Sequence, residues 1–213
     1  MSFRLPRVYP LTDFQLSGLS HAEQVHLLSL GGATLIQLRE KQLPALQFYE
    51  HAKAAAEAAR TTGAQLIIND RVDLALAAGA QGVHLGQDDM PPDAARKLLG
   101  TEAIIGYSTH NIEQVRQALT LPIDYIAIGP IFETATKSDT SPTFGLEGLK
   151  AVRQIVGDFP LVAIGGISLA NARDMIEAGA DSVAVISALL SDPARITHAT
   201  RTLLQSFPPP RQT

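Results

Sequence analysis

The chain contains no cysteine. Disulfides, thiolate metal ligands and cysteine nucleophiles are therefore excluded. The chain also lacks an excess of basic residues. It has 17 lysines and arginines and 21 aspartates and glutamates, which gives a formal net charge of −4. A general nucleic-acid binder would usually carry a basic excess, so this class of protein is disfavoured and any anion site must be local.

Long hydrophobic runs are absent as well. No run of about 18 or more apolar residues occurs, so we expect no membrane span. The first residues, Met1 to Pro6, hold no continuous apolar segment, so we expect no secretory signal and a cytoplasmic protein. The 213 residues suffice for one large core, and we expect a single domain over residues 1–207 with residues 208–213 as a frayed tail.

Short apolar runs alternate with longer amphipathic segments along the chain. We predict strands at residues 8–12, 33–38, 65–69, 82–85, 103–107, 125–128, 161–164 and 182–186. We predict helices at residues 22–30, 46–60, 72–78, 93–99, 112–119, 146–156, 169–178 and 196–204. This alternation indicates a parallel sheet, and about eight such units favour an α/β fold of the (β/α)8 TIM-barrel type. A doubly wound open sheet is the alternative, but no Gly-x-Gly-x-x-Gly follows the first predicted strand.

Residues 37–41, Gln-Leu-Arg-Glu-Lys, are the most informative segment of the chain. They follow the apolar residues 33–36, and alternation along a strand places Gln37 and Arg39 on the same face. The strand therefore delivers an amide and a guanidinium to one place, with the ammonium of Lys41 just beyond. Because barrel active sites lie at the carboxyl ends of strands, this pattern predicts an anion site on a rigid element.

Two aspartates, Asp70 and Asp89, follow the third and fourth predicted strands. Mg²⁺ is typically held by one or two carboxylates, with phosphate oxygens and water as the other ligands. Beside Arg39 and Lys41, the aspartates indicate a diphosphate–Mg²⁺ site. Taken singly, Asp70 fits equally well as the cap of the next helix, and Asp89 as a loop carboxylate before Pro91.

A second anion site is indicated where the last two predicted strands end. Gly165 and Gly166 follow the seventh strand, and Ile186 and Ser187 lie at the end of the eighth. Barrels often bind phosphate at this place through backbone N–H groups, although a tight turn is the alternative. Two phosphorylated substrates, one of which loses diphosphate, would use both sites.

Other polar residues allow more than one interpretation. We favour substrate hydrogen bonding and helix capping for Ser108 and His110 over a nucleophile–base pair. His84 alternates with apolar neighbours, which favours a hydrogen-bonded structural histidine over a ligand. Residues 133–144 form a polar segment that fits a lid or a disordered connection, and a closed lid would bring Lys137 to the diphosphate.

Taken together, these motifs resemble those of the thiamine-phosphate synthase family over nearly the full chain. The matching segments are residues 9–13, 37–41, 69–73, 82–89, 106–110, 129–132, 134–137, 145–147, 165–167 and 185–187. The resemblance implies a (β/α)8-barrel transferase that joins a hydroxymethylpyrimidine diphosphate to a thiazole phosphate, carboxylated or not. It also implies Mg²⁺ as cofactor and small phosphorylated molecules, rather than nucleic acid or membrane, as partners, with homo-oligomerisation left open.

The resemblance further implies a set of site residues. The pyrimidine diphosphate would be bound by Gln37, Leu38, Arg39, Glu40, Lys41, Asn69, Ser108 and Lys137. The metal ligands would be Asp70 and Asp89, and the thiazole phosphate would be held by Thr134, Ala135, Thr136, Gly166, Ile186 and Ser187. Arg39, Ser108 and Lys137 would be catalytic, because the departing diphosphate must be stabilised while a pyrimidine-stabilised cation forms and the thiazole nitrogen captures it. Glu40 alternates away from Arg39, so we expect its side chain to support the segment.

Two alternatives share the same scaffold. A thiazole tautomerase would use His110 to move protons, and a non-catalytic regulator of the thiamine pathway would use no chemistry at all. Neither needs the complete diphosphate set of Arg39, Lys41, Asp70, Asp89, Ser108 and Lys137. Their presence together favours the synthase.

Overall fold

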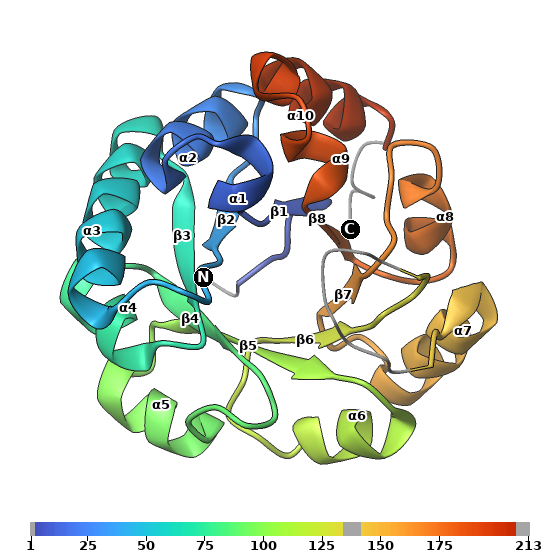
Figure 1. The fold of residues 1–213 in the computed structure, drawn as a ribbon. Coiled ribbons are helices and arrows are strands. Elements are labelled where there is room, and N and C mark those ends of the chain that lie inside the picture. Colours follow the sequence, from blue (N-terminus) through green and yellow to red (C-terminus); the bar gives the residue numbers. More distant parts are fainter. Residues whose placement is uncertain (1–2, 134–141, 208–213) are drawn as a thin grey trace.

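The computed structural model describes residues 3–133 and 142–207. It forms one parallel sheet of eight strands in the order β1-β8-β7-β6-β5-β4-β3-β2, and helices surround this sheet as an outer ring (Figure 1). The predicted (β/α)8 barrel is thus confirmed. The strands are β1 (Val8–Pro10), β2 (Leu35–Leu38), β3 (Gln65–Asn69), β4 (Gly82–Leu85), β5 (Ile104–Thr109), β6 (Tyr125–Ile128), β7 (Leu161–Ile164) and β8 (Ser182–Val185). The predicted tail and residues 134–137 lie outside the described residues.

The barrel closes between β1 and β2 through a short contact. A single bridge joins Leu11 to Gln37, and the N–H of Thr12 donates to the carbonyl of Gln37 at 2.9 Å. On the other side, the N–H of Leu11 donates to the carbonyl of Val185 at 3.0 Å. The chain just after β1 therefore lies between the end of β8 and the end of β2 and joins them.

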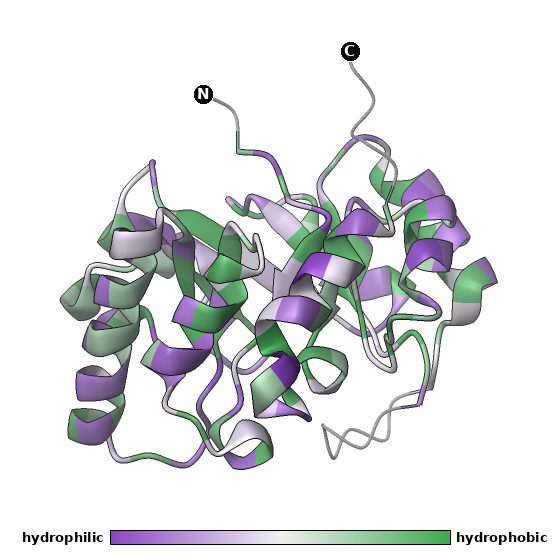
Figure 2. Ribbon diagram, turned by 90° about the horizontal axis from the view of Figure 1, so that it is seen from above, coloured by the Kyte–Doolittle hydropathy of each residue, from purple (hydrophilic) through white to green (hydrophobic). Residues whose placement is uncertain are grey.

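The helices cover the outside of the barrel. They are α1 (Phe14–Ser17), α2 (His21–Leu30), α3 (Ala45–Thr62), α4 (Val72–Ala78), α5 (Pro92–Leu99), α6 (Ile112–Ala118), α7 (Gly145–Val156), α8 (Ala172–Glu177), α9 (Ser187–Leu190), the 3₁₀ turn Pro193–Arg195 and α10 (Ile196–Gln205). Hydrophobic residues gather on the strands, and hydrophilic residues on the outer surfaces of the helices (Figure 2). Strands covered on both faces are buried along their whole length, as every residue of β2, β4, β6 and β8 is.

Local signals explain where several helices begin and end. The hydroxyl of Ser20 and the carboxylate of Glu23 form a capping box at the start of α2. Gly63 and Gly79 adopt the left-handed conformation that ends α3 and α4. In the described parts of the chain, no helix combines the length and the apolar character that crossing a membrane requires.

Two similar arginine–aspartate clamps hold the loops that lead into the strands. Arg96 lies 2.7 Å from Asp124, and Arg153 lies 2.5 Å from Asp181, with a separation of 28 residues in both pairs. The same carboxylate oxygens also accept from the backbone N–H groups of β5 and β7, at Ile105 and Leu161. The guanidinium groups donate further to the carbonyls of Gly100, Ala103, Pro122, Gly157, Phe159 and Gly179. Each arginine thus ties a helix end to the strands on either side.

Three short elements depart from the sequence prediction. The single-turn helices α1 and α9 and the 3₁₀ turn were not predicted, because a segment of three or four residues is too short to display a helical period. The first and last strands also end earlier than predicted, at Pro10 and Val185. Ile186, at the N-cap position of α9, lies outside the extended conformation with φ −119° and ψ −82°.

Candidate functional site

A cavity of about 720 Å³ opens at the carboxyl ends of the strands, and we call it the central cavity. Its lining comes from all eight strands and from loops that follow them. The lining residues are Tyr9, Leu11, Gln37, Arg39, Lys41, Asn69, Asp70, His84, Gly86, Gln87, Asp88, Asp89, Ser108, His110, Ala127, Val162, Ile164 and Ala184. The cavity therefore gathers most of the residues singled out in residues 37–110 of the sequence.

The end of β2 supplies the amide and the cations of this cavity. Gln37 and Arg39, which alternation places on one face, both line it, and so does Lys41 just beyond. Leu38 is fully buried and, by the same alternation, lies on the opposite face. The shared place of Gln37 and Arg39 in the cavity agrees with the alternation, whereas their roles toward a ligand stay a prediction.

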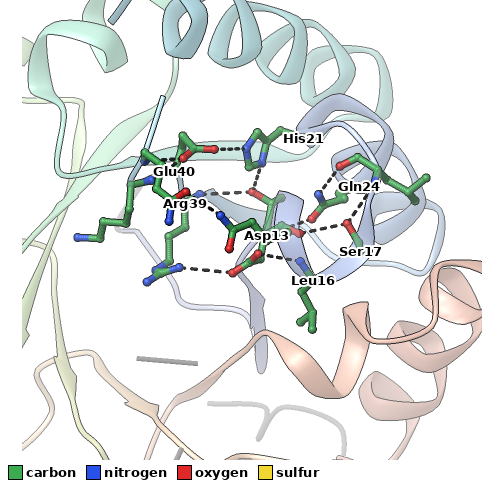
Figure 3. A network of polar contacts seen from close by, with 12 residues as sticks. Asp13, Leu16, Ser17, His21, Gln24, Arg39 and Glu40 are labelled. Carbon is green, nitrogen blue, oxygen red and sulfur yellow. Dashed lines mark hydrogen bonds and ion pairs between the residues drawn. The ribbon is translucent and has the colours of Figure 1, made fainter. Parts of the chain in front are cut away.

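Glu40 holds the turn that follows β2. Its carboxylate accepts from the N–H groups of Lys41 and Gln42, both at 2.7 Å, and lies 3.4 Å from Nε2 of His21 (Figure 3). The ring of His21 is fully buried, and its Nδ1 lies 2.7 Å from the hydroxyl of Thr12. Glu40 thus shapes the backbone that carries the two cations, which is the supporting role expected from its position.

Arg39 and Asn69 each present a polar atom that lacks a partner. Both Nε of Arg39 and Nδ2 of Asn69 are buried without a hydrogen-bond partner among the residues that the structure describes. Nη1 of Arg39 lies 3.5 Å from the carboxylate of Asp13 (Figure 3). Because buried polar groups are normally satisfied, two unpaired donors on one cavity wall indicate a site for an acceptor such as a phosphate oxygen.

The two aspartates face the same cavity. Nζ of Lys41 lies 2.6 Å from the carboxylate of Asp70, and the carboxylate of Asp89 accepts from the N–H of Gly86 at 2.6 Å. Burial raises the pKa of Asp89, and the nearby charge of Asp70 raises it further. The backbone of Asp70 is left-handed, with φ 63°, which is uncommon for a residue other than glycine. Its carboxylate does not cap α4, since the N-cap position is Arg71 and has no side-chain hydrogen bond.

A buried chain of hydrogen bonds runs beneath the cavity, and we call it the tyrosine relay. Nε2 of Gln37 donates to the hydroxyl of Tyr9 at 2.9 Å, and the hydroxyls of Tyr9 and Tyr125 lie 2.9 Å apart. The hydroxyl of Tyr125 lies 3.0 Å from Nδ1 of His84, and Nε2 of His84 lies 2.8 Å from the hydroxyl of Ser108. His84 is thus hydrogen-bonded, as predicted, but its partners include a residue that lines the cavity. Tyr9 and Tyr125 were not predicted as site residues, and a tyrosine within an apolar strand is the only sequence signal that either offers.

Ser108 and His110 do not bond to each other. The imidazole beside Ser108 belongs to His84, whereas Nδ1 of His110 lies 2.9 Å from the carbonyl oxygen of Gly129. A carbonyl can only accept, so Nδ1 of His110 carries the proton of that bond. The cap of α6 is Asn111, which accepts from the N–H of Gln114 at 2.8 Å. These contacts argue against a Ser108–His110 nucleophile pair.

A second cavity of about 730 Å³ adjoins the ends of β7 and β8, and we call it the peripheral cavity. Its lining residues are Asp13, Gln15, Leu16, Glu133, Gly166, Ile167, Ser168, Ser187, Ala188 and Ser191. Gly166 has φ 65°, and an added Cβ would lie 2.6 Å from Cβ of Phe132, so a side chain does not fit there. Ile186, which caps α9, is 8% exposed. Gly166 and Ser187 therefore share a cavity as the sequence analysis placed them, whereas Thr134, Ala135, Thr136 and Lys137 lie outside the described residues.

Comparisons with known proteins agree on one family. Residues 8–189 match the family model described as thiamine monophosphate synthase. The chain is 50% identical over 184 residues to a thiamine-phosphate synthase of Albidiferax ferrireducens, covering 86% of this chain and 84% of that protein. It is 48% identical over 186 residues to a thiamine-phosphate synthase of Chloroflexus aurantiacus, covering 87% and 85%.

A solved structure supports the same assignment. The thiamine phosphate pyrophosphorylase of Pyrococcus furiosus superposes with a TM-score of 0.83 at 36% identity, covering 94% of this chain and 96% of that one. The family model spans most of the barrel, and the relatives exceed the identity at which family membership is secure. The chain belongs to the thiamine monophosphate synthase family.

Proposed function

We propose that this chain is a thiamine-phosphate synthase, which joins a hydroxymethylpyrimidine diphosphate to a thiazole phosphate and releases diphosphate. The relatives that bear this name support the activity. The observation that carries the proposal is the composition of the central cavity, where Arg39 and Lys41 face Asp70 and Asp89. We further propose that the enzyme acts in the cytoplasm on small phosphorylated molecules.

Arg39 and Lys41 are proposed to bind the diphosphate. The guanidinium of Arg39 can engage phosphate oxygens through two parallel N–H groups, and its buried Nε has no partner among the described residues. Lys41 contributes a point charge and is half exposed, with 52% of its side chain accessible, so it can turn from Asp70 to the ligand. The unpaired amide nitrogen of Asn69 supplies a further donor on the same wall.

Asp70 and Asp89 are proposed to hold Mg²⁺. Their mutual repulsion, which contributes to the raised pKa of Asp89, is what a divalent cation would relieve. Among residues 3–133 and 142–207, no group of three or more His, Cys, Asp or Glu side chains could hold a metal ion. A two-carboxylate site suits Mg²⁺, which takes its remaining ligands from water and substrate phosphates. When bound, Mg²⁺ would neutralise negative charge on the diphosphate.

The thiazole phosphate is proposed to bind in the peripheral cavity. Gly166 brings its backbone to the cavity wall, and Ser187 begins α9, whose first N–H groups have no partner within the helix. Backbone N–H groups of this kind bind phosphate in many barrels. Ile186 and residues 134–137 complete the proposed site, the latter from outside the described residues.

The proposed reaction depends on positioning and charge rather than on proton transfer. The bond between the pyrimidine methylene carbon and the diphosphate oxygen breaks, and the diphosphate leaves with the electron pair. The lone pair of the thiazole nitrogen then forms the new carbon–nitrogen bond, so no general base is needed. Arg39 and Lys137 would stabilise the leaving diphosphate, while Gln37 and Ser108 would orient the pyrimidine.

One assay tests this proposal. Purified protein is mixed with hydroxymethylpyrimidine diphosphate, thiazole phosphate and Mg²⁺, and the products are separated by chromatography. We expect thiamine phosphate and diphosphate in equal amounts. We expect neither product when either substrate is left out. Conversion of the thiazole phosphate alone would instead indicate a tautomerase. Absence of thiamine phosphate from the complete mixture would refute the synthase assignment.

A further inference from the structure

The tyrosine relay has two ends that face the central cavity. Gln37 on β2 and Ser108 on β5 both line the cavity, while Tyr125 on β6 is fully buried behind it. Tyr9 on β1 and His84 on β4 lie between these ends in the hydrogen-bonded chain and also line the cavity. Two cavity-lining groups on different strands are thus connected through four hydrogen bonds inside the barrel.

Counting protons couples the directions of these bonds, starting from the amide nitrogen of Gln37, which donates to Tyr9. Burial raises the pKa of both tyrosines, so Tyr9 and Tyr125 each keep one hydroxyl proton. Tyr9 accepts from Gln37 and therefore donates to Tyr125, which in turn donates to Nδ1 of His84. A neutral imidazole that accepts at Nδ1 donates from Nε2, here to the oxygen of Ser108. The hydroxyl proton of Ser108 is then left to bind an acceptor in the cavity.

This order can reverse only as a whole. If Ser108 donated to His84, then Nδ1 of His84 would donate to Tyr125 and Tyr125 to Tyr9. The proton of Tyr9 would then need the amide oxygen of Gln37, so the amide would have to turn over. In either order the cavity presents one donor and one acceptor, and the two ends change together.

We propose that Tyr9, Tyr125 and His84 are positioning residues that set the hydrogen-bonding character of Gln37 and Ser108 and thereby select an aminopyrimidine. This inference rests on the proposed function. In the order that the structure displays, Gln37 offers an oxygen to the amino group and Ser108 offers a proton to a ring nitrogen. The oxo counterpart of the pyrimidine has a carbonyl in place of the amino group and a ring N–H in place of the ring nitrogen. It would therefore need a donor at Gln37 and an acceptor at Ser108.

The barrel interior is shaped to leave room for the centre of the relay. Gly106 on β5 lies against both central groups, and an added Cβ would lie 2.0 Å from Cζ of Tyr125 and 2.5 Å from Nδ1 of His84. Any side chain at this position would displace one ring or the other. The absence of a side chain at Gly106 therefore permits the Tyr125–His84 hydrogen bond.

The nitrogen chemical shifts of His84 test the relay without any substrate. Protein labelled with ¹⁵N at histidine is compared with the His84→Gln variant to assign the ring. We expect a neutral ring with its proton on Nε2, and we expect Tyr125→Phe to shift it toward a mixture of tautomers. A ring protonated on Nδ1, or on both nitrogens, would overturn the proposal. Because this readout needs no turnover, its failure is distinct from failure of the proposed function.

Kinetics with two substrates test the selection. For Tyr125→Phe we expect the KM for the aminopyrimidine diphosphate to rise about tenfold, kcat to change little and the preference over the oxo analogue to narrow. Tyr49→Phe on α3 is the matched control, and thermal unfolding checks that each variant folds. Tyr9→Phe replaces Tyr125→Phe if the latter does not fold. An unchanged KM and an unchanged preference in the folded variant would overturn the proposal.

Discussion

Arg39 and Asp13 form an ion pair between the two cavities, with Nη1 of Arg39 3.5 Å from the Asp13 carboxylate. Arg39 lines the central cavity and Asp13 lines the peripheral cavity. The other carboxylate oxygen of Asp13 caps α1 by accepting from the N–H of Leu16 at 3.0 Å (Figure 3). One aspartate thus caps a helix and partly neutralises the charge of Arg39, the arginine that is proposed to bind diphosphate.

Removing the charge of Asp13 should strengthen anion binding at Arg39. An asparagine at this position keeps an oxygen for the N–H of Leu16 but no longer competes for the guanidinium. We expect Asp13→Asn to bind inorganic diphosphate about fivefold more tightly in the presence of Mg²⁺, measured by titration calorimetry. Glu57→Gln, which breaks the exposed pair with Arg60, is the control and should change nothing. Weaker binding by Asp13→Asn would show that the carboxylate chiefly orients Arg39.

The arginine–aspartate clamps should contribute far more stability than exposed ion pairs do. Arg96 is 17% exposed and donates to backbone carbonyls as well as to Asp124, so its loss leaves several buried acceptors unpaired. We expect Arg96→Ala to lower the free energy of unfolding by about 2–4 kcal/mol. Arg60→Ala, whose side chain is 73% exposed, should leave the free energy of unfolding nearly unchanged. Urea denaturation measures both, and equal losses would contradict this account of the clamps.

Protonation of His21 should destabilise the fold. Burial lowers the pKa of His21 below its usual 6.5, although the hydrogen bond and charge of Glu40 and the charge of Asp13 oppose the shift and His51 adds to it. Below the usual pKa of histidine, the unfolded chain binds a proton at His21 that the folded chain does not. The free energy of unfolding therefore decreases as the pH is lowered, until the pH passes the pKa of His21 in the folded chain. We expect the free energy of unfolding of His21→Gln to fall less than that of the wild type as the pH is lowered through the usual range of histidine, measured by urea denaturation. Identical pH profiles for the two proteins would argue against a buried neutral His21.

The fold was predictable because its signals are strong and local. Strands buried on both faces, such as β2 and β6, appear in the sequence as short apolar runs, and the helices between them are amphipathic. The helix α1 was missed, although its cap Asp13 and its terminal Gly18 carry the usual signals of a helix start and stop. A helix of four residues is too short for the hydrophobic pattern to reveal it.

The site was predictable where its residues alternate along one strand or follow the carboxyl end of a predicted strand. Alternation places Gln37 and Arg39 on one face, and the structure places both in the central cavity. The tyrosine relay was not predicted, because Tyr9 and Tyr125 are 116 residues apart and meet only when the barrel closes. For the same reason the sequence did not reveal that Ser108 is bonded to His84 rather than to His110.

The Mg²⁺ dependence of thiamine phosphate formation tests the central claim, that Asp70 and Asp89 with Arg39 and Lys41 form a diphosphate–metal site. Initial rates are measured across a Mg²⁺ titration for the wild type, for Asp70→Asn and for the control Asp93→Asn on α5. We predict that Asp70→Asn lowers the rate at least on the order of a hundredfold and raises the Mg²⁺ concentration needed for half-maximal rate, while Asp93→Asn matches the wild type. A rate and a Mg²⁺ dependence of Asp70→Asn equal to those of the wild type would contradict the account.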